Sequence, residues 1–444
     1  MVGDVGNAYL EAHTKEKVYI VAGPDFGELE GHTLVINKAL YGLRTSGARF
    51  HDKLADTLRD MKFKSCRADP DLWLREQSDH YEYICVYVDD LMVMMKEPQV
   101  FFDELEHGYK LKGVGEPNYH LGGNFTRDPD GTLAWGAKSY IKRMLDNYKT
   151  MFGELPKPYS APLVTGDAPE LDTSMELDAD GIKKYQSLIG ALQWCVTLGR
   201  FDIACALMTL SRFRVNPRVG HMERAKHICG YLRKMDDAAI RIRTGIPHNE
   251  ESYTPPNHDW MYSVYDPATE EVDPMDPQPK GYVVRTTTFV DANLQHCKVT
   301  GKSATGILHF LNQTPIDWFS KRQGTVETST YGSEFVAARI ATEHIVDLRI
   351  TLRSMGVPID GPSWLLGDNQ SVVTSSTIPQ SVMAKCHNAL SFHRVRAAIA
   401  TGMMQFCHVS GKENPADVMT KFLPYAVFWP LIKPILFWRG ETTK

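Results

Sequence analysis

Residues 83–95 read Tyr-Ile-Cys-Val-Tyr-Val-Asp-Asp-Leu-Met-Val-Met-Met, with two adjacent carboxylates, Asp89 and Asp90, inside an apolar run. Aromatic and β-branched residues on both sides of a short polar point predict a β-hairpin with the aspartate pair at its turn. Adjacent carboxylates repel each other unless a cation lies beside them, and Mg²⁺ prefers carboxylate oxygens. Asp is also common in solvated turns, so the pair alone leaves both interpretations open.

A third carboxylate, Asp4, lies upstream in the segment Gly3-Asp-Val-Gly-Asn-Ala-Tyr-Leu10. Lys38-Ala-Leu-Tyr-Gly-Leu43 lies between this segment and the aspartate pair. The three segments, in this order, resemble the motifs of the reverse transcriptase of copia-type LTR retrotransposon Pol polyproteins (Pseudoviridae). The resemblance implies that Asp4, Asp89 and Asp90 hold two Mg²⁺ ions, or Mn²⁺, and catalyse phosphoryl transfer.

The resemblance also implies substrate contacts near these carboxylates. Tyr9 lies five residues after Asp4, where an aromatic in the family bars the 2′-hydroxyl; without the motif, a packed core aromatic is the simpler interpretation. The family continues after its second motif with Lys-Gln-Ser-Pro, whereas this chain has Arg44-Thr-Ser-Gly47 and lacks the Gln. The expected substrates are an RNA template, a DNA primer and deoxynucleoside triphosphates, and the candidate binding residues are Tyr9, Arg44 and Tyr87.

The composition is that of a globular chain with room for two or three cores: 444 residues, 43% hydrophobic and 23% charged. A net charge of -5 is no nucleic-acid signature by itself, so a binder would concentrate its basic residues locally. Eight cysteines without a Cys-x-x-Cys pair indicate a reducing compartment. No membrane span or signal peptide is recognised, so we expect an intracellular protein that is not secreted. The expected location is the cytoplasm, with a virus-like particle or the nucleus as alternatives. A homodimer is left open.

The middle of the chain has apolar residues at helical spacing, and its segments 185–190 and 200–204 resemble the helical region that follows the palm in the family. Basic residues in this part suit a thumb-like bundle on a nucleic-acid duplex, although a charged outer helix face gives the same pattern. These basic residues are Arg212, Arg214, Arg218, Arg224, Lys226, Arg233 and Lys234.

Four acidic residues in the C-terminal part lie at the ends of predicted strands or near the start of predicted helices. They are Asp291, Glu334, Asp368 and Asp417. Carboxylates grouped at one edge of a sheet can share two metal ions. The local strings 302–306, 316–323, 333–335, 367–371 and 414–421 resemble the copia-type ribonuclease H. The resemblance implies a DEDD site that binds two Mg²⁺ and hydrolyses RNA in an RNA–DNA hybrid.

Histidines and cysteines in the C-terminal part give weaker hypotheses. His387, His393 and His408 lie near positions where the family carries histidines, and one of them is a candidate for a catalytic or product-release role, although structural histidines are more common. Cys386-His387 and Cys407-His408 could form a zinc site, but structural zinc prefers closely paired ligands at short spacing.

A change in composition separates the two halves of the chain. Residues 245–280 are rich in Pro, Asp, Glu and Asn and are predicted to be an extended linker. Because the first catalytic Asp follows Met1 by three residues, we expect the palm to lack the fingers region that precedes it in the family. The expected domains are a palm (1–150), a thumb- or connection-like helical region (151–244), the linker, a ribonuclease H-like domain (281–424) and an apolar tail (425–444). The tail is either a segment that packs on the body or an exposed, unprotected end.

The sequence therefore predicts an α/β and α+β multidomain chain, in which a reverse-transcriptase palm and thumb precede a ribonuclease H-like mixed sheet. The expected function is RNA-directed DNA polymerase and ribonuclease H. Two alternatives are left open: a ribonuclease H-only nuclease, and a non-catalytic nucleic-acid-binding remnant of a decayed or domesticated element.

Overall fold

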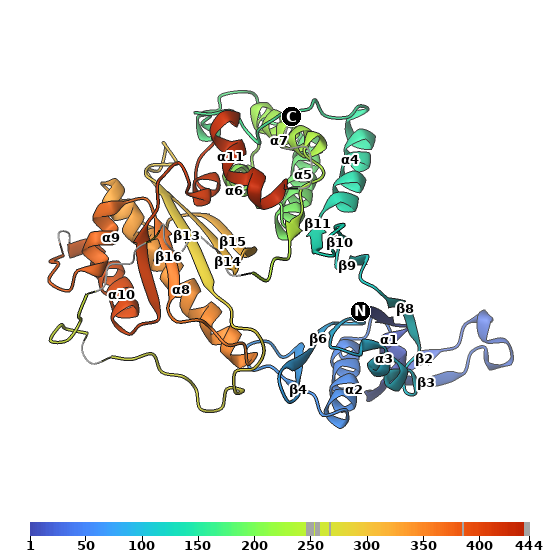
Figure 1. Ribbon diagram of the computed structural model, residues 1–444. Helices are drawn as coiled ribbons and strands as arrows, with labels where there is room; N and C mark the ends of the chain where they lie inside the picture. The colour runs from blue at the N-terminus through green and yellow to red at the C-terminus, as the bar shows by residue number, and fades with distance from the viewer. Residues whose placement is uncertain (246–252, 254–257, 266–267, 384–385, 439–444) are drawn as a thin grey trace. The chain divides into compact units, whose positions relative to one another are not determined.

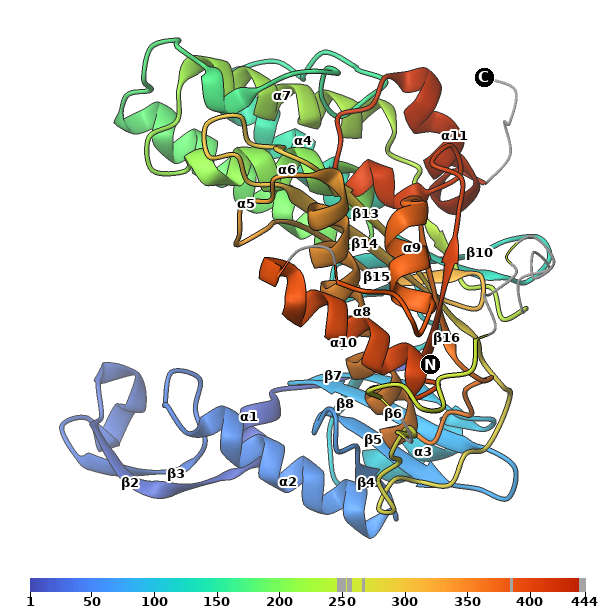
Figure 2. The same cartoon turned by 90° about the vertical axis from the view of Figure 1, so that its left-hand side faces the viewer.

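The computed structural model describes residues 1–245, 253, 258–265, 268–383 and 386–438. The chain separates into two compact units (Figures 1 and 2), the first made of residues 1–120, 275–282 and 350–358, the second of 121–274, 283–349 and 359–444. Part of the predicted linker, residues 246–252, 254–257 and 266–267, lies outside the described residues. The predicted domain limits stay predictions.

An antiparallel sheet forms the centre of the first unit, with the strand order β4-β5-β6-β7-β1-β8. The predicted hairpin is confirmed: β6 and β7 pair from Tyr83↔Met94 to Tyr87↔Asp90, and Val88 and Asp89 form the turn. The strands are β1 (Val2–Val5), β4 (Lys64–Ser65), β5 (Leu72–Glu76), β6 (Tyr81–Tyr87), β7 (Asp90–Met94) and β8 (Leu111–Gly115).

Two helices of the first unit, α2 (Ser46–Asp60) and α3 (Pro98–Glu106), share a hydrophobic core with this sheet. α2 buries Phe50, Leu54 and Leu58 at helical spacing. The short helix α1 (Ala8–Glu11) follows β1 after Asn7, and β9 (Tyr119–His120) lies at the end of this part of the chain.

A two-stranded arm projects from the rest of the first unit (Figures 1 and 2). It consists of β2 (His13–Val21) and β3 (Thr33–Lys38), joined through a 3₁₀ segment, η1 (Pro24–Leu29). Large apolar side chains on the arm are exposed, among them Tyr19, Val21 and Val35. The sequence analysis does not predict this arm, since its apolar residues would normally indicate a buried strand.

The C-terminal part of the second unit contains a mixed sheet in the order β15-β14-β13-β16-β17. β13, β14 and β15 are antiparallel neighbours, and β13, β16 and β17 run parallel. The strands are β13 (Thr286–Asn293), β14 (Ala304–Leu311), β15 (Thr314–Arg322), β16 (Ser363–Gly367) and β17 (Met404–His408). This is the predicted mixed sheet, and the predicted α/β and α+β fold class is confirmed.

Alternating side chains divide this sheet into two buried faces. On one face, Val290, Ile307 and Phe319 pack in a core with Phe335 and Ala341 of the long helix α8. Figures 1 and 2 both show α8 along this sheet. The helices on this side are α8 (Thr330–Ser354), α9 (Gln370–Thr377) and α10 (Ala389–Ala400).

The opposite face of the sheet joins the helical region in one continuous core. Leu308 and Phe310 of β14 are buried there, and the ring of Trp318 in β15 lies 5.4 Å from that of Phe201. The apolar tail forms α11 (Tyr425–Leu436), which buries Phe428 and Ile432 in the same core. The helical region contains α4 (Lys138–Phe152), α5 (Ala179–Thr197), α6 (Ala204–Leu210) and α7 (Val219–Lys234), with the strands β10 (Gly123–Arg127), β11 (Leu133–Gly136) and β12 (Ile240–Arg241).

Each of the seven basic residues proposed for a duplex surface donates a hydrogen bond within the protein. Arg224 forms salt bridges with Asp167 and Asp172, and Arg218 bonds to Glu176. The interpretation of these residues as a charged outer helix face therefore agrees better with their contacts than a surface that binds a nucleic-acid duplex. No helix in the described part of the chain combines the length and the apolar composition that a bilayer crossing requires.

Candidate active sites

The backbone pairing of the first unit brings the three palm carboxylates to one place. Asp4 in β1 lies opposite Asp90, the first residue of β7, in the antiparallel register. The Val5 amide donates a hydrogen bond to the Asp89 carbonyl over 2.9 Å, which fixes the turn beside the end of β1. The structure thus places Asp4, Asp89 and Asp90 together although 85 residues separate Asp4 from Asp89.

The charges around Asp4 show that these acids interact. Partial burial raises the pKa of Asp4, and the carboxylates of Asp89 and Asp90 raise it further. Lys112, the cross-strand partner of Asp4 in β8, lowers it. The site therefore concentrates negative charge against one lysine, an arrangement that favours a bound cation.

Two tyrosines flank the palm carboxylates. The rings of Tyr9 in α1 and Tyr41 lie 4.5 Å apart, and Tyr9 also contacts Phe50 at 6.4 Å. Slight burial and the charges of Asp89 and Asp4 raise the pKa of Tyr41, so its hydroxyl group lies in the field of the acids. Tyr41 is 61% exposed and is available for a ligand.

The other candidate substrate residues are solvent-accessible. Tyr87, directly before the turn, is 60% exposed. Arg44 is exposed in the segment that leads into α2. Their roles stay predictions, as does that of Tyr9.

The second unit brings the four predicted ribonuclease acids to one end of the mixed sheet. Asp291 lies in β13 two residues before the strand ends, and Asp368 directly follows β16, the parallel neighbour of β13. Glu334 is in the second turn of α8, and Asp417 is in the 3₁₀ helix η7 (Pro415–Met419). One carboxylate oxygen from each of Asp291, Asp368 and Asp417 lies within 4.8 Å of the others.

Local hydrogen bonds explain how η7 reaches β13. The buried side chain of Asn414 accepts a bond from the Ala416 amide and caps η7. Its Nδ2 donates to the Val290 carbonyl over 2.9 Å. Asn414 therefore fastens the helix that carries Asp417 to the strand that carries Asp291.

A lysine and a threonine complete this carboxylate cluster. Lys421 Nζ donates to Asp417 Oδ1 over 2.6 Å and to Asp291 Oδ1 over 3.2 Å. Thr420 Oγ1 donates to Asp291 Oδ2. Sequence reasoning assigned no role to either residue, although both lie in the string 414–421 that resembles the family.

Burial and the neighbouring carboxylates raise the pKa of three of the acids, Glu334, Asp368 and Asp417. Burial raises the pKa of Glu334 well above its usual range, and Asp291 and Asp368 raise it further. Burial, followed by the charge of Asp291, raises the pKa of Asp417 to about 7 despite Lys421. Paired carboxylates with raised pKa values are typical of sites built around a cation.

The histidines predicted as candidates are each hydrogen-bonded within the protein. His387 Nε2 lies 3.3 Å from Glu327 Oε2, and His393 Nδ1 lies 2.6 Å from the Tyr265 hydroxyl. His408 Nε2 contacts the carbonyl of Asp368 at 3.1 Å, so it is the histidine next to the carboxylate cluster.

The described residues contain two groups whose ligand atoms lie close enough for a metal ion. One is the set Asp291, Asp368 and Asp417, and the other is His309, Asp317 and His344. Neither contains a cysteine, so the zinc hypothesis for Cys386-His387 and Cys407-His408 gains no support. The palm acids, whose oxygens do not all lie within 4.8 Å of one another, form a looser group.

The chain is similar to known proteins over most of its length. Residues 2–156 match the family model described as reverse transcriptase (RNA-dependent DNA polymerase). The retrovirus-related Pol polyprotein from transposon RE1 of Arabidopsis thaliana is 24% identical over 430 residues, which cover 96% of this chain and 26% of that protein. The corresponding polyprotein from transposon TNT 1-94 of Nicotiana tabacum is 24% identical over 437 residues, 95% of this chain and 29% of that protein.

The chain is also similar to a solved structure, the foamy viral protease-reverse transcriptase in complex with an RNA/DNA hybrid. The matched region covers 92% of this chain and 64% of the foamy viral chain. Its sequence identity is 12% and its TM-score 0.29. The chain spans between 26% and 29% of the length of the RE1 and TNT 1-94 polyproteins.

Proposed function

We propose that this chain, which over most of its length is similar to Pol polyproteins of copia-type retrotransposons, is the RNA-directed DNA polymerase and ribonuclease H portion of such a polyprotein. The polymerase site takes an RNA template, a DNA primer and deoxynucleoside triphosphates. The nuclease site takes the RNA strand of an RNA–DNA hybrid, recognised by shape, phosphates and 2′-hydroxyls. All eight cysteines are unpaired, which agrees with a reducing intracellular compartment.

The observation that carries this proposal is the carboxylate cluster at the end of the mixed sheet. Asp291, Asp368 and Asp417 converge within 4.8 Å, beside Glu334. Their oxygens are hard ligands that fit Mg²⁺ or Mn²⁺. When bound there, two such ions would supply an activated water and stabilise the leaving 3′ oxygen.

The chain's own residues have separate tasks in the nuclease site. Asn414 holds Asp417 against β13, and Thr420 orients Asp291 through its hydroxyl group. Lys421 forms salt bridges with Asp291 and Asp417 and partly neutralises them. When a divalent cation binds, the Lys421 ammonium group has to move away from these two carboxylates or share their oxygens with the cation. His408, bonded to the Asp368 backbone, positions the loop that carries this acid.

In the polymerase site, Asp4, Asp89 and Asp90 would hold the same kind of ion, which would activate the primer 3′-hydroxyl. Lys112 balances the charge of Asp4. Tyr9, supported by Tyr41 and Phe50, forms an aromatic wall beside the acids and would select deoxynucleotides.

Cleavage of a labelled RNA–DNA hybrid by the full chain tests the nuclease. We expect cleavage of the hybrid that depends on Mg²⁺, and no cleavage of free RNA. Asp368→Asn should lower the cleavage rate at least about 100-fold, because even residues that only contact metal ligands change metal affinity or activity about 10–100-fold. Hybrid binding by this variant should be nearly unchanged. Asp347→Asn, an exposed acid on α8, is the matched control and should cleave normally; equal cleavage by Asp368→Asn would remove the site assignment.

Primer extension on an RNA template tests the polymerase separately. We expect incorporation of deoxynucleotides that Asp89→Asn abolishes, by about 100-fold or more, while Asp60→Asn, an exposed acid at the end of α2, has no effect. Hybrid cleavage without any incorporation would instead support a ribonuclease H-only protein. Salt-sensitive hybrid binding with neither activity would support a non-catalytic remnant.

A further inference from the structure

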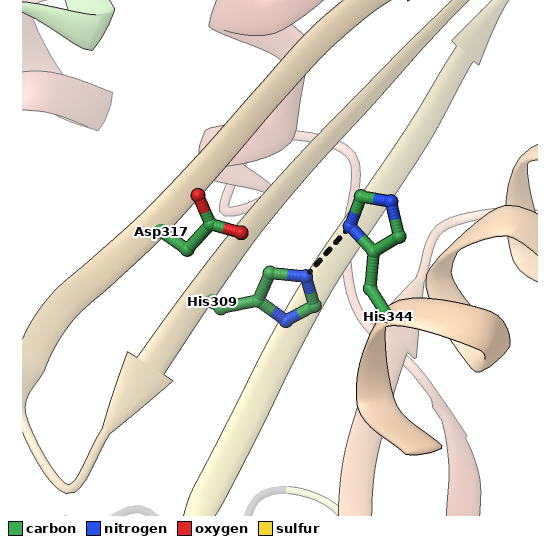
Figure 3. Close-up of side chains that lie close together, drawn as sticks. All are labelled: His309, Asp317 and His344. Carbon is green, nitrogen blue, oxygen red and sulfur yellow. Dashed lines mark hydrogen bonds between the residues drawn. The ribbon is translucent and has the colours of Figure 1, made fainter. Parts of the chain in front are cut away.

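Two histidines and an aspartate meet on the α8 side of the mixed sheet, outside both carboxylate sites (Figure 3). His309 of β14 and Asp317 of β15 are directly opposite each other in the antiparallel register. His344 reaches them from α8. One ligand atom of each residue lies within 4.8 Å of the others. Two consecutive strands and the helix that follows them thus contribute one side chain each.

The distance between the two imidazoles matches a shared metal ion better than a direct bond. His309 Nε2 and His344 Nδ1 are 3.4 Å apart. This separation is long for a hydrogen bond between nitrogen atoms. Two nitrogens bound at 2.0–2.1 Å to a tetrahedral Zn²⁺ are about 3.4 Å apart, from the tetrahedral angle.

Neighbouring side chains orient both histidines for this role. Thr288 of β13, opposite His309 in the sheet, contacts His309 Nδ1 through Oγ1 at 2.8 Å. A ring nitrogen that donates to such a partner leaves Nε2 as the free ligand atom. The ring of Phe319 packs edge-on against His344 at 5.0 Å.

This group differs from the Mg²⁺-type sites in chemistry and position. Two imidazoles with one carboxylate favour Zn²⁺ and similar transition metals, whereas the acid clusters favour hard ions. His344 follows Glu334 by ten residues, which is about 15 Å along α8. Asp317 is exposed, so an ion can enter from solvent and a water molecule can fill the fourth position.

We propose that His309, Asp317 and His344 bind one zinc-class divalent metal ion, with water as the fourth ligand, and that this ion fastens α8 to β14 and β15. The site is structural: binding to the folded state alone stabilises that state in proportion to the occupancy. This inference is independent of the proposed polymerase and nuclease activities.

The test uses the full chain, freed of metal by a chelator and titrated with Zn²⁺ in a large excess of Mg²⁺ that occupies the carboxylate sites. We expect one Zn²⁺ to bind per chain, Tm to rise with Zn²⁺, and Co²⁺ at the same site to show the intense visible absorption of a four-coordinate ion. His344→Gln and Asp317→Asn should each weaken binding at least about tenfold and abolish the absorption band. Thr288→Val should weaken binding roughly tenfold by releasing the His309 ring.

Asp71→Asn is the matched control, because Asp71 also pairs with a histidine, His51, at 3.1 Å, but on an exposed surface. This variant should bind Zn²⁺ as the unmodified chain does. Since replacement of the buried His309 also perturbs the packing around it, the decisive variant is Asp317→Asn, whose side chain is exposed. Zn²⁺ binding that Mg²⁺ displaces, or that Asp317→Asn and His344→Gln leave intact, would overturn the proposal.

Discussion

Val88, at the tip of the palm hairpin, adopts a backbone conformation that its side chain disfavours. Its φ angle is 57°, in the left-handed region. A β-branched residue rarely occurs there, and such a conformation costs on the order of 1–3 kcal/mol. Glycine is the usual solution in a two-residue hairpin turn. The strained residue immediately precedes the Asp89–Asp90 pair. The paired strands β6 and β7 therefore hold the turn, and with it the two acids, in a conformation that Val88 alone would not favour.

Replacement of this residue by glycine separates strain from function. We expect Val88→Gly to leave the free energy of unfolding unchanged or to raise it by about 1 kcal/mol, because relief of strain offsets the entropy of glycine. Primer extension should decrease, since the turn loses its rigid link to Asp89. Urea denaturation and the extension assay measure the two effects.

Val35→Gly provides the comparison for that experiment. Val35 is exposed in strand β3, as Val88 is exposed at the turn. Without strain to relieve, Val35→Gly should cost about 0.5–1 kcal/mol. A loss of stability in Val88→Gly as large as that in Val35→Gly would show that the turn is not strained.

Cys297 is a buried thiol with an unusual charge state. Burial would raise its pKa, but hydrogen bonds from Thr300 and from the Arg212 guanidinium, at 3.1 Å, outweigh burial and lower the pKa to about 7. Because the pKa of the thiol in the unfolded chain is near 8.5–9, the folded state gains stability as the pH rises from about 7 to about 9. That contribution is lost as the pH falls through 7.

We therefore expect the destabilisation caused by Cys297→Ser to be larger at pH 9 than at pH 6.5, by about 1–2 kcal/mol. Urea denaturation of both proteins at both pH values measures it. Burial raises the pKa of Cys407 to about 11, so the cost of Cys407→Ser should not increase at pH 9 and should decrease slightly, because the thiol ionises first in the unfolded chain. An equal cost of Cys297→Ser at the two pH values would contradict an ionised thiol.

At the scale of elements, the sequence predicts features that local pattern determines. The hairpin around Val88 and Asp89, the strand that ends before Asp368 and the helix with Asp417 near its start each carry their signal within a few residues. The arm β2–β3 lacks such a signal, because its exposed apolar residues imitate a buried strand.

Contacts that depend on register between distant elements could not be predicted. Lys112 faces Asp4 only because β8 pairs with β1 in that register. Lys421 reaches Asp291 across 130 residues. His309, Asp317 and His344 carry no recognisable spacing, since a strand pairing and a helix packing bring them together. A one-residue shift of β14 would move His309 to the other face of the sheet.

At the scale of the whole molecule, the second unit joins the helical region and the mixed sheet in one hydrophobic core. Phe310 and Leu308 face helices that precede residue 245 rather than solvent. α11 closes the same core with Phe428 and Ile432, and the Ala239 amide donates to the carbonyl of Leu436 over 2.9 Å. The composition change at residues 245–280 separates the helical region from the mixed sheet along the sequence. It does not separate two cores, because residues from both sides of it pack in the same core.

We therefore expect the segment 281–444 not to fold alone, whereas 121–444 keeps the core. Exposure of each large apolar side chain costs about 1.5–3 kcal/mol, so four or five of them together cost about 6–15 kcal/mol, as much as the 5–15 kcal/mol that stabilises a typical domain. Hydrogen exchange at the amides of β14 and binding of a hydrophobic dye measure the difference: rapid exchange and strong dye binding for 281–444, slow exchange and weak binding for 121–444 and the full chain. Slow exchange in 281–444, with a cooperative urea transition, would show instead that the sheet, α8 and α11 suffice. In that case the helical region would be an attached layer rather than part of the same folding unit.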